Sequence, residues 1–311
     1  MKKVYDLVVV GGGPAGLTAG IYAGRSNLSV LVIEKSGVGS LAMAHSIENY
    51  PGFAEELTGK ELLAKMKDQA KKFGVEFMEG TFLGIDIYSD PKIVKTDVDN
   101  VEARTIVVAL GAGKNSGKKL VGEKEFLGKG VSYCATCDGA FTRNMTVSLF
   151  GQGEEVAEEA LFLTRFSREI NIFIKDSEFK CSEESLKLLK ENEKVKIYLG
   201  AEIKELKGGE YLESAKVLID GEEKEFDTQY AFLYLGTKNL TELIGEFATL
   251  DKAGFVETDD TMKTKVDGIY VAGDMVAKKV RQVTTAVNDG TIAGMEVVKY
   301  LSLIHIWRCR R

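Results

Sequence analysis

Two cysteines near the middle of the chain, Cys134 and Cys137, are separated by two residues. A Cys-x-x-Cys pair can cycle between dithiol and disulfide, because the start of a helix can lower the pKa of a thiol there. One thiol attacks the disulfide of a partner, and the other resolves the mixed disulfide. Asp138 follows the pair and is a candidate proton carrier, with a structural role as an acidic residue at a helix N-terminus as the alternative. The pattern predicts thiol–disulfide exchange at Cys134, Cys137 and Asp138.

The remaining sulfur and imidazole side chains are scattered. The chain has four cysteines and two histidines, and the isolated ones are Cys181, Cys309, His45 and His305. A structural disulfide framework needs several pairs, and a structural zinc site needs four clustered ligands. We therefore expect neither a disulfide framework nor a metal site.

A glycine-rich turn, Gly11-x-Gly13-x-x-Gly16, follows a short β-branched run near the N-terminus. Such glycines permit a tight turn and a close approach of the backbone to a pyrophosphate, which the start of the following helix attracts. Glu34 lies 18 residues after Gly16, near the spacing at which a carboxylate binds ribose hydroxyls. The strand, helix and second strand are expected at residues 5–10, 17–25 and 29–33. This unit predicts a nucleotide cofactor that supplies electrons to the dithiol.

A second unit of the same kind begins 140 residues later, at the turn Gly151–Gly153. Its strands are expected at residues 146–150 and 170–174, with a helix that continues through residues 156–161. A C-terminal strand at 268–274 and a helix at 284–299 are expected to complete the first unit. The predicted fold is α/β, with two Rossmann-like three-layer nucleotide-binding domains, the second inserted in the first. The expected boundaries are 1–113 and 242–300 for the first domain and 114–241 for the second.

The last eleven residues differ in character from the rest of the chain. Residues 301–311 contain the single tryptophan, Trp307, together with one of the two histidines and a cluster of arginines. We interpret this segment as a non-native tail that resembles a translated sequencing adaptor, and we exclude it from the fold prediction. The alternative is an aromatic residue that stacks on a flavin.

The overall composition excludes several classes of protein. The net charge is −6, with 44% hydrophobic and 28% charged residues, so a general nucleic-acid binder is not expected. No apolar run of about 18 residues is present, so no membrane-spanning helix is expected. The N-terminus leads directly into a strand and lacks the pattern of a signal peptide, which predicts a cytoplasmic protein.

Several short motifs, taken in order, make the chain resemble the low-molecular-weight flavoprotein thioredoxin reductases over residues 3–300. The motifs are the opening glycine turn, Glu48–Gly52, Cys134–Gly139, Gly268–Asp274 and Arg281–Val283. The resemblance implies FAD as cofactor, a homodimer, and a dithiol that reduces thioredoxin. It also implies that Cys137 contacts the flavin and that Cys134 attacks the partner.

The resemblance further implies which residues hold FAD. The opening turn would bind the pyrophosphate, Glu34 the ribose, Asp274 the ribityl chain, and residues 281–283 the isoalloxazine. Ser40 stands where the family usually has glutamine, a departure that should weaken one flavin contact. The full expected set is Gly11, Gly13, Pro14, Ala15, Gly16, Glu34, Ser40, Asn49, Gly273, Asp274, Arg281, Gln282 and Val283.

The second glycine turn departs from the NADPH-dependent members of that family. Glu154 and Glu155 stand at the start of its helix, where their charge opposes a pyrophosphate. Asp176 replaces an arginine of the family's 2′-phosphate motif, and Gly236–Asn239 lacks the family's proline. This pattern resembles the ferredoxin-dependent flavin thioredoxin reductases. Dependence on NADH or NADPH remains the enzymatic alternative, and a flavin-binding redox sensor is the non-enzymatic one.

A ferredoxin donor requires a basic surface on this acidic protein, because reduced ferredoxin is itself acidic. Lysines and an arginine near the predicted flavin and dithiol segments are the candidates for that surface. They are Lys118, Lys119, Lys124, Lys129, Lys278, Lys279 and Arg281. The alternative for each of them is an ordinary solvated side chain.

Overall fold

A computed structural model of the chain describes residues 3–35, 39–112, 120–133, 135–235, 244, 247–251 and 254–308, with the backbone alone at Cys137 and at 304–308. The chain divides into two compact units. Unit 1 combines Met1–Gly113 with Asn239–Arg311, and unit 2 is the segment Lys114–Lys238 between them. Both connections between the units fall in stretches outside the described residues.

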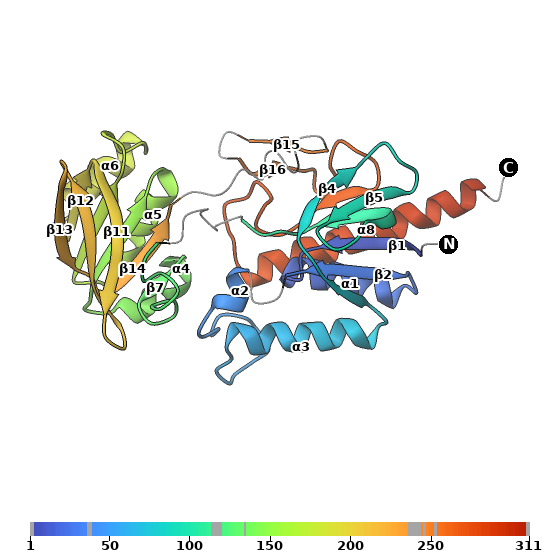
Figure 1. Cartoon of the computed structure of the whole chain (residues 1–311), viewed down its shortest axis with the longest axis horizontal. Coiled ribbons are helices and arrows are strands. Elements are labelled where there is room, and N and C mark those ends of the chain that lie inside the picture. Colours follow the sequence, from blue (N-terminus) through green and yellow to red (C-terminus); the bar gives the residue numbers. More distant parts are fainter. Residues whose placement is uncertain are drawn as a thin grey trace. The chain divides into compact units, whose positions relative to one another are not determined.

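Unit 1 is built on a seven-stranded sheet in the order β3-β2-β1-β6-β5-β4, with β17 also paired to β6 (Figure 1). Strands β1, β2, β3, β6 and β17 pair in parallel, and β4 and β5 pair antiparallel. The strands are β1 (Val4–Val10), β2 (Val30–Glu34), β3 (Glu76–Glu79), β4 (Phe82–Asp86), β5 (Lys92–Thr96), β6 (Val101–Val108) and β17 (Ile269–Val271). The last four residues of β1 are buried on both faces, as is typical of a central parallel strand.

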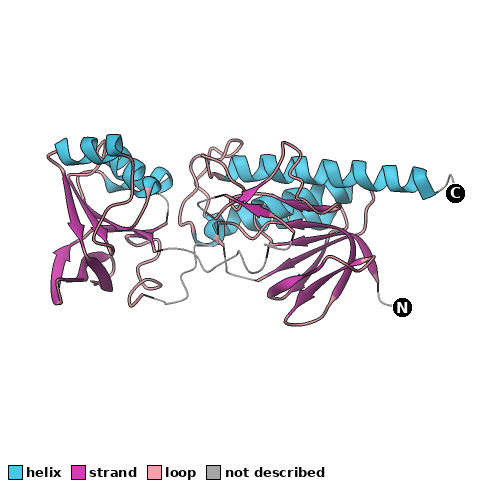
Figure 2. Ribbon diagram, turned by 90° about the horizontal axis from the view of Figure 1, so that it is seen from above, coloured by secondary structure: helices cyan, strands magenta, loops and turns pink. Residues whose placement is uncertain are grey.

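In the described part of unit 1, the helices with assigned bounds are α1 (Pro14–Arg25), α2 (Ser40–Met43), α3 (Gly59–Lys72) and α8 (Val283–Arg308). Helix α1 packs against both α3 and α8, and most of its buried residues are small. Figure 2 shows the helices of this unit packed along its sheet. A capping box in which Thr58 and Glu61 bind each other's backbone amides fixes the start of α3. A small two-stranded sheet of β15 (Thr249–Leu250) and β16 (Val256–Glu257) completes this unit among the residues described.

Unit 2 contains a five-stranded parallel sheet in the order β10-β9-β8-β14-β7 and an antiparallel sheet in the order β11-β12-β13. The strands are β7 (Val131–Ser132), β8 (Thr146–Gly151), β9 (Glu169–Ile174), β10 (Val195–Leu199), β11 (Ala201–Gly208), β12 (Leu212–Ile219), β13 (Glu222–Asp227) and β14 (Tyr230–Tyr234). Its helices are α4 (Ala135–Asp138), η1 (Gly139–Thr142), α5 (Glu154–Leu163) and α6 (Glu183–Glu191).

The parallel sheet of unit 2 has a hydrophobic core on each face. Phe150 and Phe173 stack with ring centroids 4.9 Å apart and pack toward the antiparallel sheet. Their neighbours Leu149 and Ile172 belong to the other core, with Val156 and Ala160 of α5. The two cores alternate along β8 and β9 because successive side chains of a strand point to opposite faces. The unit therefore has three layers, with helices on one side of the central sheet.

The predicted fold class is confirmed, because both units are α/β, with a parallel sheet in unit 2 and a mostly parallel sheet in unit 1. One predicted element ends elsewhere: α8 continues to Arg308, so the backbone of the segment predicted as a non-native tail is helical as far as it is described. Leu301, the first residue of that segment, is buried. No helix in the described part of the chain is long and apolar enough to span a membrane.

Candidate functional site

The first glycine turn joins β1 to α1, and its three motif glycines have different surroundings. A Cβ on Gly11 would lie 2.2 Å from the Ala109 carbonyl oxygen, and φ at Gly11 is +113°. A Cβ on Gly16 would lie 1.9 Å from the Gly11 carbonyl oxygen. A Cβ on Gly13 would meet nothing within 4 Å. Gly11 and Gly16 are therefore required by the packing of the chain itself, whereas Gly13 leaves the approach to the turn open.

The start of α1 has donors for an anion. Gly13 is the N-cap residue, and no side chain caps the helix there. Pro14 at the first helical position has no N–H, so the amides of Ala15 and Gly16 are the first backbone donors of the helix. An uncapped helix start with open space above it fits the pyrophosphate of a dinucleotide. The backbone of α8 lies close to Ala15, since a Cβ on Gly290 would lie 2.2 Å from the Ala15 carbonyl oxygen.

Glu34 ends β2 beside this turn. One carboxylate oxygen pairs with the ammonium of Lys67 on α3, and the other would be 2.2 Å from a Cβ on Gly12. The Glu34 side chain is only 12% exposed. The carboxylate is thus fixed next to the glycine turn, in the place expected for a group that binds ribose hydroxyls.

Asn49 and Gln282 lie together although 233 residues separate them in the chain. The Asn49 amide nitrogen donates to the Gln282 side-chain oxygen at 3.2 Å. Gln282 directly precedes α8, which begins at Val283, and Ser40 is the exposed first residue of α2. The structure thereby brings together two residues predicted to lie at the flavin.

Asp274 and Gly273 follow β17, and Arg281 is tied to the same loop. The Arg281 guanidinium donates to the carbonyl oxygen of Asp274 at 3.1 Å and lies over the Phe255 ring, 3.6 Å from its centroid. The Gly273 amide donates to the buried carboxylate of Asp289 at 3.1 Å. This loop is therefore fixed by groups of its own unit, which suits a binding segment that must keep its shape.

The prediction that Lys278 belongs to an exposed docking surface is wrong. Its ammonium lies 2.7 Å from Asp289 and 3.9 Å from Asp274, and its side chain is 17% exposed. The Asp289 carboxylate is buried, and a buried charge without a partner of opposite sign is costly, so the Lys278 ammonium pairs with it. Arg281 is likewise directed into its own unit. Of the other candidates, Lys124, Lys129 and Lys279 are exposed, while Lys118 and Lys119 lie outside the described residues.

The dithiol segment begins just outside the described part of the chain, because Cys134 and the side chain of Cys137 are not described. Ala135 begins α4 and is fully buried. Its amide N–H donates to a Glu159 carboxylate oxygen at 2.9 Å and to the Tyr234 hydroxyl at 3.2 Å. The first amide of this four-residue helix is thus already bonded, which weakens the expectation that it stabilises a thiolate.

The second glycine turn joins β8 to α5, and a Cβ on its N-cap residue Gly153 would meet nothing within 4 Å, but side chains next to the turn bind the neighbouring segments. The Gln152 side chain donates to the Asp176 carboxylate at 3.3 Å and to the Glu178 carbonyl at 2.8 Å, and accepts from the Lys180 amide at 2.9 Å. Asp176 in turn pairs with the Lys180 ammonium at 3.0 Å. These contacts join the turn to the loop after β9.

Glu154 links the starts of two helices. It is the first residue of α5, and its carboxylate accepts from the Ser182 amide, the Ser182 hydroxyl and the Ser185 hydroxyl at the start of α6, at 2.5, 3.0 and 2.5 Å. The hydrogen bond from Ser185, followed by that from the Ser182 amide, lowers the pKa of Glu154. Glu154 therefore stays ionised and places a negative charge at this turn, whereas its neighbour Glu155 is exposed.

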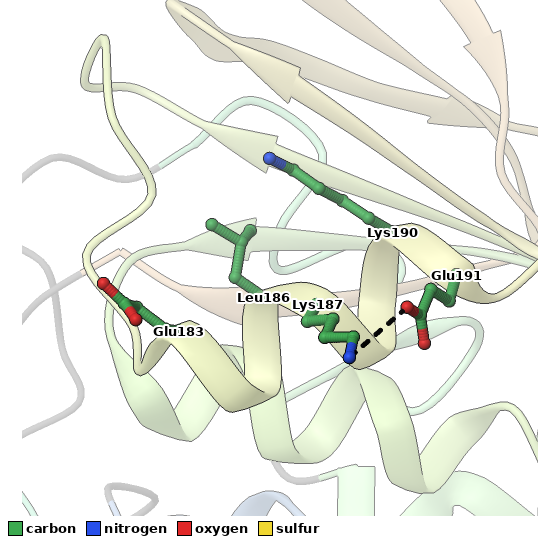
Figure 3. A pocket seen from close by; sticks show the side chains of 5 residues that line it. All are labelled: Glu183, Leu186, Lys187, Lys190 and Glu191. Carbon is green, nitrogen blue, oxygen red and sulfur yellow. Dashed lines mark ion pairs between the residues drawn. The ribbon is translucent and has the colours of Figure 1, made fainter.

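A hollow on α6 is a separate feature of unit 2 (Figure 3). It is lined by Glu183, Leu186, Lys187, Lys190 and Glu191. All five residues come from one helix, and Lys187 and Glu191 form an ion pair across one turn. This hollow is a shallow groove between surface side chains of one helix, and we assign no function to it. The part of the chain that the structure describes also contains no cluster of potential metal ligands.

Both units are α/β and contain parallel strands. One has an open glycine turn and the other a Cys-x-x-Cys segment, and together these features define a nucleotide-dependent disulfide oxidoreductase. The chain belongs to the pyridine nucleotide-disulphide oxidoreductase family, whose model matches residues 5–290. The expected cofactor is confirmed as FAD, which the residues around Gly13 and Glu34 fit.

Among its relatives, thioredoxin reductase of Bacillus subtilis is 39% identical in an alignment 310 residues long that covers 96% of this chain and 96% of its own. The crystal structure of thioredoxin reductase from Streptococcus pyogenes is 35% identical, covers 97% of this chain and 99% of its own, and has a TM-score of 0.87. A ferredoxin-flavin thioredoxin reductase from Clostridium acetobutylicum is 28% identical with a TM-score of 0.53, covering 97% of this chain and all of its own.

Proposed function

We propose that this flavoprotein reduces the disulfide of thioredoxin through Cys134 and Cys137, and that it receives its electrons from reduced ferredoxin. Relatives named thioredoxin reductase that align over nearly the whole chain support the substrate. The enzyme would act as a homodimer, as the sequence resemblance implies. FAD suits this task because it can accept electrons one at a time and deliver them in pairs.

We assign separate residues to cofactor binding, to thiol–disulfide exchange and to proton transfer. Gly13 and the amides of Ala15 and Gly16 hold the cofactor's pyrophosphate, and Glu34 orients its ribose. One cysteine thiolate attacks the thioredoxin disulfide, which forms a mixed disulfide and releases one thioredoxin thiolate. The second cysteine then attacks the sulfur of the first, which releases the other thioredoxin thiolate as the Cys134–Cys137 disulfide closes; protonation gives two thioredoxin thiols. Asp138 is proposed to move the proton that accompanies this exchange.

The observation that carries the proposed donor is the pair of carboxylates beside the second glycine turn, Glu154 and Asp176. An NADPH molecule would bring a pyrophosphate to the start of α5 and a 2′-phosphate to the loop after β9. Glu154 places a carboxylate at that helix start, and Asp176 places another in that loop. Each charge-assisted hydrogen bond that an arginine would have made contributes about 1.5–3 kcal/mol, so losing two weakens binding by roughly 10²–10⁴-fold.

The remaining support for ferredoxin comes from surface charge and from one relative. Lys124, Lys129 and Lys279 are exposed, and an acidic donor would be attracted to such lysines despite the negative net charge. The relative from Clostridium acetobutylicum carries ferredoxin in its name. Because Lys278 is paired internally, it has no part in the proposed docking surface.

NADH is the second candidate donor, since a carboxylate after the second strand of such a unit can bind ribose hydroxyls. Asp176 occupies that position, directly after β9 and Lys175. Its carboxylate already pairs with Lys180 and accepts from Gln152, so an NADH ribose would have to displace both. This competition favours ferredoxin over NADH.

Anaerobic stopped-flow mixing tests the donor directly. Reduced ferredoxin should bleach the flavin absorbance, and millimolar NADPH or NADH should leave the flavin oxidised. Rapid bleaching by either nucleotide at micromolar concentration would refute the ferredoxin proposal. The double variant Glu154→Ser, Asp176→Arg should gain reduction by NADPH, whereas Glu155→Ser, a neighbouring exposed carboxylate, should not.

The dithiol has its own test. Cys134→Ser and Cys137→Ser should each abolish thioredoxin reduction while keeping a full complement of FAD, because the flavin site lies in unit 1. Cys181→Ser is the matched control, since Cys181 is an isolated and partly buried thiol. Turnover that survives in either variant of the pair would remove the dithiol from the mechanism.

A further inference from the structure

Two neighbouring residues of α8, Asp289 and Gly290, contact the two segments of unit 1 that are predicted to bind FAD. Gly290 lies against the start of α1, since a Cβ there would be 2.2 Å from the Ala15 carbonyl oxygen. Asp289 reaches the loop after β17, where its carboxylate accepts from the Gly273 amide at 3.1 Å. The two segments also touch each other, because a Cβ on Gly273 would lie 2.9 Å from the Cβ of Ala15. Helix α8 therefore connects the first glycine turn to the loop after β17.

Asp289 brings a charge into the interior of this contact. The residue is only 5% exposed, and the Lys278 ammonium donates at 2.7 Å to the same carboxylate oxygen that accepts from the Gly273 amide. The ammonium also lies 3.9 Å from a carboxylate oxygen of Asp274. A buried carboxylate without a cation is costly, and a charged acceptor binds an amide more strongly than a neutral one does. Lys278 therefore allows an acidic side chain to hold the Gly273 amide in the interior.

The other polar contacts of this loop differ from the contact with Asp289. The Val276 amide donates to the Gly273 carbonyl oxygen at 3.0 Å and closes a turn. The Arg281 guanidinium donates to the carbonyl oxygens of Asp274 and Val276 at 3.1 and 3.4 Å. These bonds join residues of the loop to one another and fix its shape. The bond to Asp289 instead ties the start of the loop to the helix that contacts the glycine turn.

We propose that Asp289 is a positioning residue for FAD, with Lys278 as the cation that keeps its carboxylate buried. The carboxylate fixes the Gly273 amide, and with it the loop that carries Asp274, relative to the start of α1. The proposal rests on the placement of FAD in the proposed function, with the pyrophosphate at α1, and on the expected contact of the ribityl chain with Asp274. Because one FAD molecule must contact both segments, a fixed distance between them reduces the entropy that is lost on binding.

Asp6 offers a comparison within the same unit. Its carboxylate accepts from the Ser29 amide at 2.9 Å and pairs with the Arg104 guanidinium at 2.8 Å, so it too joins a backbone amide to a cation. Asp6 lies near the start of β1, however, and the glycine turn follows the end of that strand. Ligands of such sheets bind at the carboxyl ends of the strands. The Asp6 pair should therefore contribute to stability and not to the binding of FAD.

The test compares two double variants of the FAD-loaded protein in which both charges are removed. Lys278→Met with Asp289→Asn keeps an acceptor for the Gly273 amide, because the side-chain oxygen of asparagine can replace a carboxylate oxygen. Lys278→Met with Asp289→Leu has the same branching at this position and no acceptor. The contact of Lys278 with Asp274 is lost equally in both variants.

The rate of FAD release is measured after dilution, from the fluorescence of the free flavin. The leucine variant should release FAD about 3–10-fold faster than the asparagine variant, which corresponds to the loss of one hydrogen bond. Visible circular dichroism of the bound flavin should differ between the two variants, because the loop beside the ribityl chain is held in only one of them. A contribution to overall stability alone would not change that spectrum.

The matched control applies the same substitutions at the other end of the sheet. Arg104→Met is combined with Asp6→Asn or with Asp6→Leu, and these two variants should release FAD at equal rates although their stabilities in urea differ. The proposal is overturned if the two Asp289 variants release FAD equally fast, or if the two Asp6 variants differ by as much as they do.

A single variant keeps the proposal testable if the leucine variant fails to fold. In Lys278→Met the Asp289 carboxylate has lost its cation, so it should turn toward water and give up the Gly273 amide. Adding Asp289→Asn should then slow the release of FAD, and an unchanged rate would overturn the proposal.

Release of FAD needs neither an electron donor nor thioredoxin. Failure to reduce thioredoxin with any donor would refute the proposed function and leave the difference in FAD release intact. Equal release from the two Asp289 variants, with full reduction of thioredoxin, would refute the role of Asp289 alone. The two hypotheses therefore fail separately.

Discussion

Gly13→Asp should remove FAD from the protein without unfolding it. The backbone at Gly13 has φ of −83°, which any residue adopts, and a Cβ there meets nothing within 4 Å. Gly13 is the N-cap of α1, and aspartate is a favoured N-cap residue because its carboxylate accepts from the first helical amides. The substitution should therefore leave the free energy of unfolding of the apoprotein unchanged or raise it by a few tenths of a kcal/mol.

The loss of FAD follows from the same geometry. The new carboxylate would occupy the helix start that the pyrophosphate needs. Two like charges ~4 Å apart repel by about 4 kcal/mol at an effective dielectric constant of ~20, which corresponds to roughly a 10³-fold increase in the Kd of FAD. Fluorescence titration of the apoprotein with FAD measures this Kd, and urea unfolding measures the stability.

Gly13→Asn separates charge from volume, because asparagine has the same shape and also caps helices. It should weaken FAD binding far less than aspartate does. Gly16→Ala is the opposite control, since its Cβ would lie 1.9 Å from the Gly11 carbonyl oxygen and should destabilise the fold itself. The reasoning is refuted if Gly13→Asp keeps wild-type affinity for FAD, or if Asn and Asp weaken binding equally.

Four further predictions concern stability, each measured by urea unfolding. Lys278→Met should cost about 3 kcal/mol, because it leaves the buried carboxylate of Asp289 without its cation, and a neutral result would show that the pair is dispensable. Thr58→Ala should lower the free energy of unfolding by about 1 kcal/mol, because it removes the N-cap of α3. Phe173→Ala should lower it by about 3–5 kcal/mol, because it leaves a cavity where the Phe173 ring stacks on Phe150. The pKa of Glu154 is lowered in the folded protein, so its contribution to stability is present above its unfolded pKa of about 4.3 and is lost as the pH falls through the folded value. The stability difference between wild type and Glu154→Gln should therefore shrink only in acid, and a constant difference from neutral pH downward would contradict this assignment.

The elements that carry the first glycine turn could be predicted from sequence because local signals agree there. The β-branched run of β1, the turn glycines and the small-residue pattern of α1 each favour the same structure, and the spacing to Glu34 follows from that unit. The pairing of Asn49 with Gln282 depends on how distant segments meet, so no local pattern gives it. The resemblance to known reductases supplied both residues, and their contact had to come from the structure.

The interpretation of charge was less accurate than that of backbone pattern. Lys278 resembled its exposed neighbour Lys279 in sequence, but Asp289, eleven residues later on α8, turns its ammonium inward. The spacing of a lysine and an aspartate does not by itself distinguish a buried pair from two solvated side chains. The role of Glu154 was likewise predicted only in part: its charge at α5 was expected, whereas the serines of α6 that bind it were not.

The two glycine turns show why such a motif alone does not identify a ligand. A Cβ on Gly151 would lie 2.5 Å from the Cβ of Tyr234, so this glycine is required by the contact between β8 and β14 whether or not a nucleotide binds. The same holds for Gly11 against Ala109 in unit 1. Selection on folding alone would therefore keep these glycines after a nucleotide site had lost its ligand. Both turns leave their helix starts open: Gly13 and Gly153 are N-cap residues without a side-chain cap, and a Cβ on either would meet nothing within 4 Å. The second turn differs in its neighbours, because Gln152 and Glu154 bind the adjoining loop and helix. Under the proposed ferredoxin donor, the difference between the two turns lies in the polar side chains around them, and those are the residues whose substitution should restore a nucleotide.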